Sequence, residues 1–144
     1  MAMHKITLGE GYGLILSCEE RLLDVPKDSP GDLVLFLHGL GCDHSSFAGA
    51  WAEEGLEGYS LLAPDLPGHG DSDAIKDLAY RLQDHAEIIL RLLEQLPFER
   101  LHIVGHSMGG AIAIQMMLDH PQTVKSITLI GSAGLGTNIN SDYL

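Results

Sequence analysis

Short runs of apolar residues alternate with longer helix-like segments along this chain. The run at residues 33–37 is apolar without a break, which is typical of a strand buried on both faces of a parallel sheet. Similar runs predict strands at residues 5–8, 12–18, 59–63, 101–104 and 127–130. The first two flank a glycine-rich turn at residues 9–11, so they are predicted to form a hairpin.

The segments between the later strands predict helices. Leucine and isoleucine recur at helical spacing over residues 75–96, and Pro97 ends that pattern. A short helix is predicted at residues 45–51, and a third helix at residues 107–119. This alternation of strands and helices predicts an α/β fold with a mostly parallel, doubly wound sheet, helices on both faces and right-handed crossovers.

One strand-to-helix junction has the pattern of a catalytic turn. The strand at residues 101–104 runs into Gly-x-Ser-x-Gly, with Ser107 at its centre and an apolar helix after it. Gly105 and Gly109 let the strand and the helix approach closely. The helix N-terminus would direct amide N–H groups at an oxyanion beside Ser107. The alternative is a glycine-rich turn that carries a serine without using it.

Two other polar, glycine-rich loops follow apolar strands. His38 and Gly39 come directly after the strand at residues 33–37. Residues 64–72, Pro-Asp-Leu-Pro-Gly-His-Gly-Asp-Ser, follow the strand at residues 59–63. Loops of this kind at the carboxyl ends of buried strands mark the binding edge of a doubly wound sheet.

Taken in chain order, from His38-Gly39 through residues 64–72 to the Gly-x-Ser-x-Gly turn at Ser107, these three motifs resemble those of the α/β-hydrolase superfamily. The resemblance covers the whole chain and implies that Ser107 is a nucleophile. It implies that the backbone amides of Leu40 and Met108 form an oxyanion hole. The ending Ser-Ala-Gly-Leu-Gly at residues 132–136 is similar to a subset near the acyltransferase-linked hydrolases of acetoin dehydrogenase complexes, proline iminopeptidases and carbon–carbon bond hydrolases.

The same resemblance implies roles that shape the site. His38 would shape the oxyanion loop together with Gly39, and His106 would pack beside the nucleophile with its side chain directed away from Ser107. His44 lies near the mouth of the site and could reach a substrate. Cys42 is interpreted as a small buried residue, because no cationic partner that would activate its thiol is evident. Phe47 and Trp51 are either core residues or walls of an acyl pocket.

The superfamily orders its triad as serine, acid and histidine, and the residues after Ser107 supply this order poorly. Asp119 and His120 lie about 18 Å along the predicted helix from Ser107, whereas a base must come within about 3 Å. Asp142 follows the last strand, but no histidine follows it. We therefore expect residues 1–144 to be the N-terminal part of a single hydrolase domain, without the cap and last two strands. The alternative is a complete protein with an unusual upstream base.

Composition narrows the classes of partner. A net charge of −12 disfavours nucleic acids and anionic membranes. No apolar run is long enough to span a membrane, and Cys18 and Cys42 form neither a disulfide framework nor a metal-binding spacing. We predict a cytoplasmic protein with no metal and no cofactor. The strand that begins at Ser126 and ends at Ile130 lacks the charges of an edge strand, which predicts self-association if it is exposed.

Together, these expectations favour a serine hydrolase that acts on an ester, amide or thioester through an acyl-enzyme on Ser107. Its expected partner is a small-molecule substrate, and residues 1–144 alone are expected to be inactive. A haloalkane dehalogenase is disfavoured because the resemblance implies an aspartate at the elbow for that chemistry, whereas this chain has Ser107 there. The alternative class is a non-catalytic binding module that keeps the fold but lacks the triad acid and base.

Overall fold

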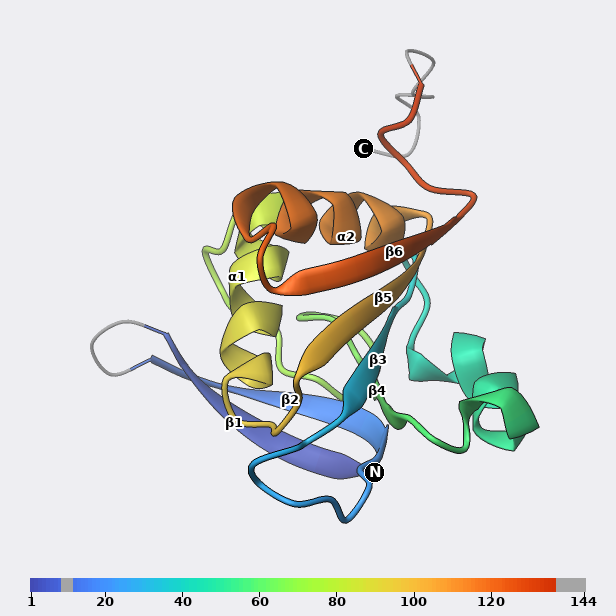
Figure 1. Ribbon diagram of the computed structural model, residues 1–144. Coiled ribbons are helices and arrows are strands. Elements are labelled where there is room, and N and C mark those ends of the chain that lie inside the picture. The colour runs from blue at the N-terminus through green and yellow to red at the C-terminus, as the bar shows by residue number, and fades with distance from the viewer. Residues whose placement is uncertain (9–11, 137–144) are drawn as a thin grey trace.

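The computed structural model describes residues 1–8 and 12–136, which form a six-stranded sheet flanked by helices (Figure 1). The strands lie in the order β1-β2-β4-β3-β5-β6. Their bounds are β1 (Ala2–Leu8), β2 (Tyr12–Arg21), β3 (Asp32–Leu37), β4 (Ser60–Pro64), β5 (Arg100–His106) and β6 (Val124–Ile130). β1 and β2 pair antiparallel, as do β2 and β4, and the other pairs are parallel. The predicted fold class is confirmed.

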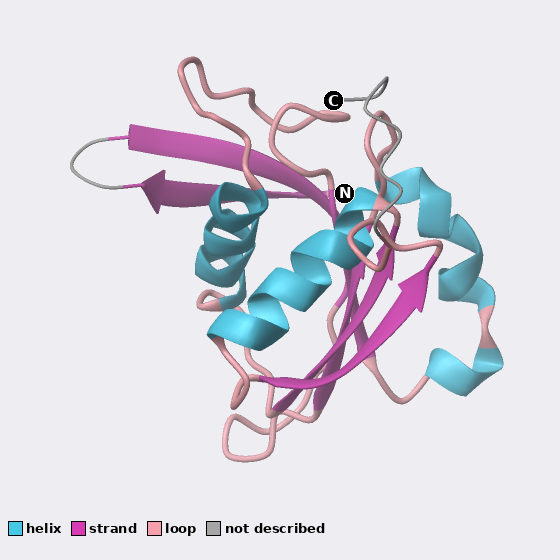
Figure 2. Cartoon of the chain, turned by 90° about the horizontal axis from the view of Figure 1, so that it is seen from above, coloured by secondary structure: helices cyan, strands magenta, loops and turns pink. Residues whose placement is uncertain are grey.

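Helices cover both faces of the sheet, as Figure 2 shows. The α-helices α1 (Leu82–Leu93) and α2 (Met108–Asp119) pack on one face over the larger apolar core. The 3-10 helices η1 (His44–Ala52) and η2 (Glu54–Leu56) lie on the other face, where Phe47 and Trp51 pack against Phe36. These two aromatic side chains are therefore part of the apolar packing beneath η1.

The burial of the strands follows their place in the sheet. Residues 33–37 of β3 and all of β4 are buried, as the uninterrupted apolar pattern predicts. β6 lies at one edge of the sheet and pairs only with β5 within the described residues. Val124 at its start is buried, residues 126–130 alternate between exposed and partly buried, and Ile130 at its end is 48% exposed.

The prediction of one helix over residues 75–96 is wrong in its first part. α1 begins at Leu82, and Asp77 and Tyr80 have φ angles of 68° and 54°, which an α-helix does not tolerate. The Asp84 carboxylate accepts a hydrogen bond from the backbone N–H of Arg81 and caps the helix there. The apolar side chains of the preceding loop still pack on the core, so their spacing imitates a helix.

Two smaller differences concern element type and length. The helix predicted at residues 45–51 is the 3-10 helix η1, and β2 extends beyond Cys18 to Arg21. The predicted hairpin turn at residues 9–11 and the acid Asp142 lie outside the described residues. In the part of the chain that the structure describes, no helix is both long and apolar enough to span a membrane.

Candidate active site

Ser107 lies at the sharp turn between β5 and α2, with φ 52° and ψ −115°. Such a conformation costs a non-glycine residue roughly 1–3 kcal/mol and persists only where its surroundings impose it. Here the Ser107 N–H donates to the carbonyl of Ile130 at 3.1 Å. The Ser107 carbonyl accepts from the N–H groups of Gly110, Ala111 and Ala133 at 3.0–3.3 Å. Backbone hydrogen bonds from the end of β6 and from α2 therefore hold the strained residue in place.

Close approach explains the glycines around Ser107. A Cβ atom on Gly105 would lie 2.5 Å from the carbonyl oxygen of Gly109. A Cβ on Gly109 would collide with the carbonyl of Leu37 at the end of β3. A Cβ on Gly110 would collide with the side chain of Ser132. The elbow thus requires glycine at all three positions because backbone or close side-chain atoms occupy the space of a methyl group.

The loop after β3 lies directly against the elbow. A Cβ on Gly39 would lie 3.2 Å from Cβ of Ser107 and 3.0 Å from Nδ1 of His106. Leu40 follows Gly39 and its side chain is 60% exposed, whereas Met108 is the first residue of α2 and packs partly on the core. The first N–H groups of an α-helix have no partner within the helix, so the Met108 amide is available beside Ser107. The structure thus brings Gly39 of the loop after β3 against His106 and Ser107 of the elbow.

His38 fixes the start of this loop. Its side chain is fully buried, and its Nε2 accepts a hydrogen bond from the Leu66 N–H at 2.9 Å. Nδ1 therefore carries the proton and donates to the Gly39 carbonyl at 2.8 Å. Burial, which disfavours the charged imidazolium, lowers the pKa of His38. His38 is thus a neutral structural link between the loop after β3 and the loop after β4.

Asp65 is central to the hydrogen bonds behind the site, although the sequence pattern gives it no role of its own. Its side chain is fully buried, and its Oδ1 accepts from both the backbone N–H and Nδ1 of His44 at 2.8 Å. Its Oδ2 accepts from the Asp71 N–H at 3.0 Å. Burial opposes ionisation, but the hydrogen bonds from Asp71 and His44 hold the pKa of Asp65 below its ordinary value. An aspartate directly after a buried strand was the signal, because a buried carboxylate needs such partners.

One group of side chains has the spacing of metal ligands. Oxygen or nitrogen atoms of Asp43, His44 and Asp65 lie within 4.8 Å of one another. Both Asp65 oxygens already accept backbone or imidazole N–H groups, and Oδ1 of Asp43 accepts from Ser45. Internal hydrogen bonding therefore accounts for this cluster without an ion.

The hydrogen-bonded histidines of the described chain have partners other than the Ser107 hydroxyl. His4 bonds Glu20, His69 bonds the Pro67 carbonyl and His102 bonds Ser126, in addition to the His38 and His44 contacts above. His85 is buried with its Nδ1 unpartnered, and burial lowers its pKa to about 4. Residues 1–8 and 12–136 thus supply no hydrogen-bonded general base to Ser107.

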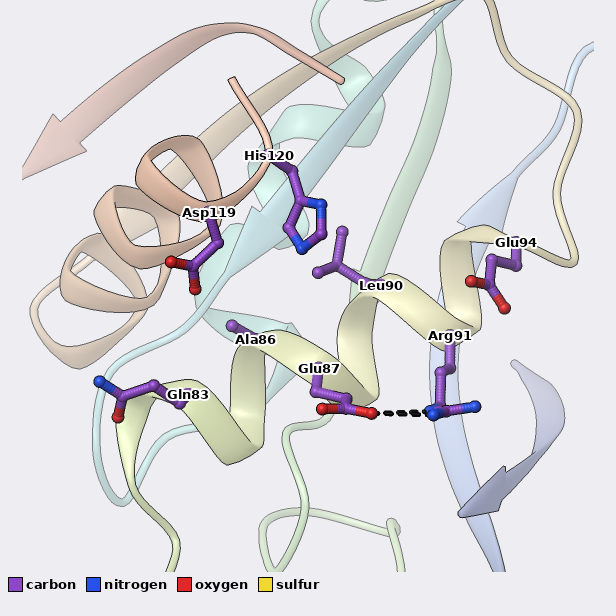
Figure 3. Close-up of a pocket in the computed structure, with 8 residues that line it drawn as sticks. All are labelled: Gln83, Ala86, Glu87, Leu90, Arg91, Glu94, Asp119 and His120. Atoms are coloured by element: carbon purple, nitrogen blue, oxygen red, sulfur yellow. Dashed lines mark hydrogen bonds and ion pairs between the residues drawn. The ribbon is translucent and has the colours of Figure 1, made fainter. Parts of the chain in front are cut away.

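Asp119 and His120 lie at the opposite end of α2 from Ser107. They line a groove of about 340 Å³ between α1 and α2, where they face residues of α1 (Figure 3). The Arg91 guanidinium lies beside this groove and pairs with Glu87 at 2.8 Å. This groove is separate from the elbow, so the acid and histidine that follow Ser107 in the described chain do not complete a triad.

Comparison with known proteins agrees with the geometry. A family model described as "alpha/beta hydrolase fold" matches residues 32–143. The chain is 36% identical over 120 residues to the dihydrolipoyllysine-residue acetyltransferase component of the acetoin cleaving system of Cupriavidus necator, covering 81% of this chain and 31% of that protein. It is 31% identical to 2-hydroxy-6-oxo-6-phenylhexa-2,4-dienoate hydrolase of Burkholderia cepacia, covering 76% of this chain and 39% of that protein.

Solved structures show the same architecture. An esterase from Exiguobacterium antarcticum superposes with a TM-score of 0.74 at 28% identity, covering 90% of this chain and 45% of the esterase. The chain therefore spans about a third of the length of the curated relatives and less than half of the solved structure.

Proposed function

The chain belongs to the α/β-hydrolase fold family, and from this premise we propose that it is the N-terminal part of a single serine-hydrolase domain. The length of the relatives supports the proposal that this chain is only part of a domain, since each relative extends well beyond the matched region. The substrate would be a small molecule with an ester, thioester or amide carbonyl, as for a carboxylesterase.

Ser107 acts as the nucleophile in this proposal. Its Oγ attacks the carbonyl carbon, and the backbone N–H groups of Leu40 and Met108 stabilise the oxyanion, each by roughly 3 kcal/mol. Collapse of the tetrahedral intermediate expels the leaving group and leaves an acyl-enzyme, which water then hydrolyses. An acid and a histidine from the rest of the domain activate Ser107. The observation that supports this role is the strained φ of Ser107, held by backbone hydrogen bonds directly beside Gly39.

A fluorophosphonate probe tests the role of Ser107 in the full-length product of the gene. We expect one modified peptide, containing Ser107, and loss of both labelling and turnover in Ser107→Ala, by several powers of ten for turnover. Ser132→Ala is the matched control. The Ser132 hydroxyl is also close to the elbow but donates to the Ala133 carbonyl, so its removal should leave labelling unchanged. Labelling at wild-type rate in Ser107→Ala would contradict the proposal.

A second candidate function is a binding module without catalysis. The observation that favours it is that the described residues bring no hydrogen-bonded base to Ser107. The same experiment separates the two functions, because a binding module would leave Ser107 unlabelled in the full-length protein. Residues 1–144 alone should turn over esters at a negligible rate under either function. Hydrolysis by this chain that depends on Ser107 would indicate an upstream base such as His44.

We also propose that residues 1–144, purified alone, self-associate through the edge of β6. This strand pairs with β5 on one side within the described residues, and its exposed end carries Ile130. Sedimentation velocity at about 100 μM should show oligomers, in the concentration range where exposed strands associate. Thr128→Lys places a charge on an exposed position of β6 and should restore a monomer. A wild-type chain that stays monomeric would exclude this association.

A further inference from the structure

The loop of residues 39–43 is tied at both ends to the loop that follows β4. At its start, His38 accepts from the Leu66 N–H. At its end, His44 donates two hydrogen bonds to the Asp65 carboxylate. Residues 65 and 66 are adjacent, so two neighbouring positions of one loop hold both ends of the other. Leu40, the proposed oxyanion donor, lies between these two attachments.

The attachment at Asp65 is rigid. The Asp65 N–H donates to the Ser17 carbonyl at 2.8 Å, and its own carbonyl accepts from the Ser72 hydroxyl at 2.7 Å. Oδ2 accepts from the Asp71 N–H, and Gly70 packs so closely that a Cβ there would collide with the carboxylate. Contacts that do not involve His44 therefore already fix the position of the carboxylate.

The protonation states at this attachment follow from its partners. Asp65 accepts three N–H groups and is therefore ionised, so its Oδ1 acts only as an acceptor. The Nδ1 of His44 must carry a proton to bond it at 2.8 Å. The result is a charge-assisted hydrogen bond, which is shorter and stronger than a neutral one.

We infer that His44 and Asp65 are positioning residues of the active site: their hydrogen bond fixes the end of the loop of residues 39–43 and thereby the Leu40 amide relative to Ser107. This inference rests on the proposed function. In this inference, neither His44 nor Asp65 touches the substrate. They act through the loop, which is in contact with the elbow at Gly39. A displaced amide weakens oxyanion stabilisation because a donor must lie about 3 Å from the oxyanion.

Three variants test this role in the full-length protein. His44→Leu removes the imidazole donor, and His44→Asn keeps an N–H donor at the position of Nδ1. His4→Leu is the matched control, because His4 forms a comparable bond to Glu20 at 2.7 Å on the β1–β2 hairpin. Two quantities are measured: amide hydrogen exchange of residues 39–42, and the second-order rate of fluorophosphonate modification of Ser107.

We expect His44→Leu to speed the exchange of residues 39–42 and to slow modification of Ser107, each by about 10-fold, as for loss of one charge-assisted hydrogen bond. His44→Asn should recover most of both effects, and His4→Leu should change neither. Unchanged exchange in His44→Leu, faster exchange without slower modification, or failure of His44→Asn to recover would each overturn the inference. If the wild-type Ser107 is not modified at all, the proposed function fails, while the exchange comparison still decides whether the attachment exists.

Discussion

The described chain holds non-glycine residues with positive φ angles in two segments of different construction. One is the elbow, with Ser107 at 52°, and the other is the loop before α1, with Asp77 at 68° and Tyr80 at 54°. Backbone groups from β6 and α2 fix the elbow, and glycines let β3, β5 and α2 meet around it. The loop before α1 is closed by one side chain, since the Tyr80 hydroxyl accepts from the Ile75 N–H and donates to the Ile75 carbonyl.

The strained backbone therefore has a different role in each segment: at the elbow it orients the proposed nucleophile, and in the loop it only connects β4 to α1. At the elbow, many backbone contacts impose one conformation and present a hydroxyl at the carboxyl edge of the sheet. In the loop, a removable side-chain contact turns the chain so that Ile75 and Leu78 pack on the core before α1 begins. We therefore expect the elbow to tolerate almost no change of shape and the loop to tolerate moderate change.

The largest effect is expected for Gly109→Ala at the elbow. The new methyl group would collide with the backbone carbonyls of Leu37 and His38, which cannot move without breaking β3. The free energy of unfolding should fall by more than about 3 kcal/mol, as measured by urea denaturation. Gly49→Ala is the matched control, because a Cβ there meets nothing within 4 Å. A loss at Gly109 no larger than that at Gly49 would show that the elbow is not tightly packed.

The next effect concerns His85, which packs against Tyr80 at a ring distance of 5.8 Å. Its pKa of about 4 in the folded protein lies below the ordinary 6.5, so the unfolded chain binds the proton first as pH falls. Stability should therefore be intact above pH 6.5 and should fall between pH 6.5 and 4, by roughly 3 kcal/mol in total. Urea denaturation of the wild type and His85→Leu at both pH values isolates this residue. If the free energy of unfolding changed equally with pH in both proteins, His85 would not be the source of the pH dependence.

The two segments also differ in how far the sequence predicts them. The sequence predicts the elbow because its glycines stand at fixed distances from Ser107 between an apolar strand and an apolar helix. The same pattern wrongly predicts a helix over the loop because Ile75, Leu78 and Leu82 keep helical spacing, and no glycine or proline in residues 75–81 marks the turn. The bond between His44 and Asp65 joins residues 21 positions apart, and no local pattern encodes such a contact.

Tyr80→Phe tests the single contact that closes the loop. It removes both hydrogen bonds to Ile75 and leaves the half-buried Ile75 N–H without its partner. We expect the free energy of unfolding to fall by about 2 kcal/mol. Tyr59→Phe provides the control, since Tyr59 packs through its ring, edge-on against His102, and phenylalanine keeps that ring. Equal, small changes in both variants would mean that the hydroxyl does not hold the loop.

The smallest effect distinguishes the two segments by function. Glycine relieves the cost of a positive φ, roughly 1–2 kcal/mol, but adds conformational freedom to the unfolded chain, worth about 0.4–1 kcal/mol. Asp77→Gly should therefore stabilise the fold by about 0.5 kcal/mol, and Ser107→Gly should stabilise it by a similar or slightly larger amount. Only Ser107→Gly should abolish fluorophosphonate labelling of the full-length protein, because it alone removes the proposed nucleophile. A destabilising effect of glycine at Ser107 would mean that the hydroxyl contributes to folding, and the strained turn would then have a structural explanation.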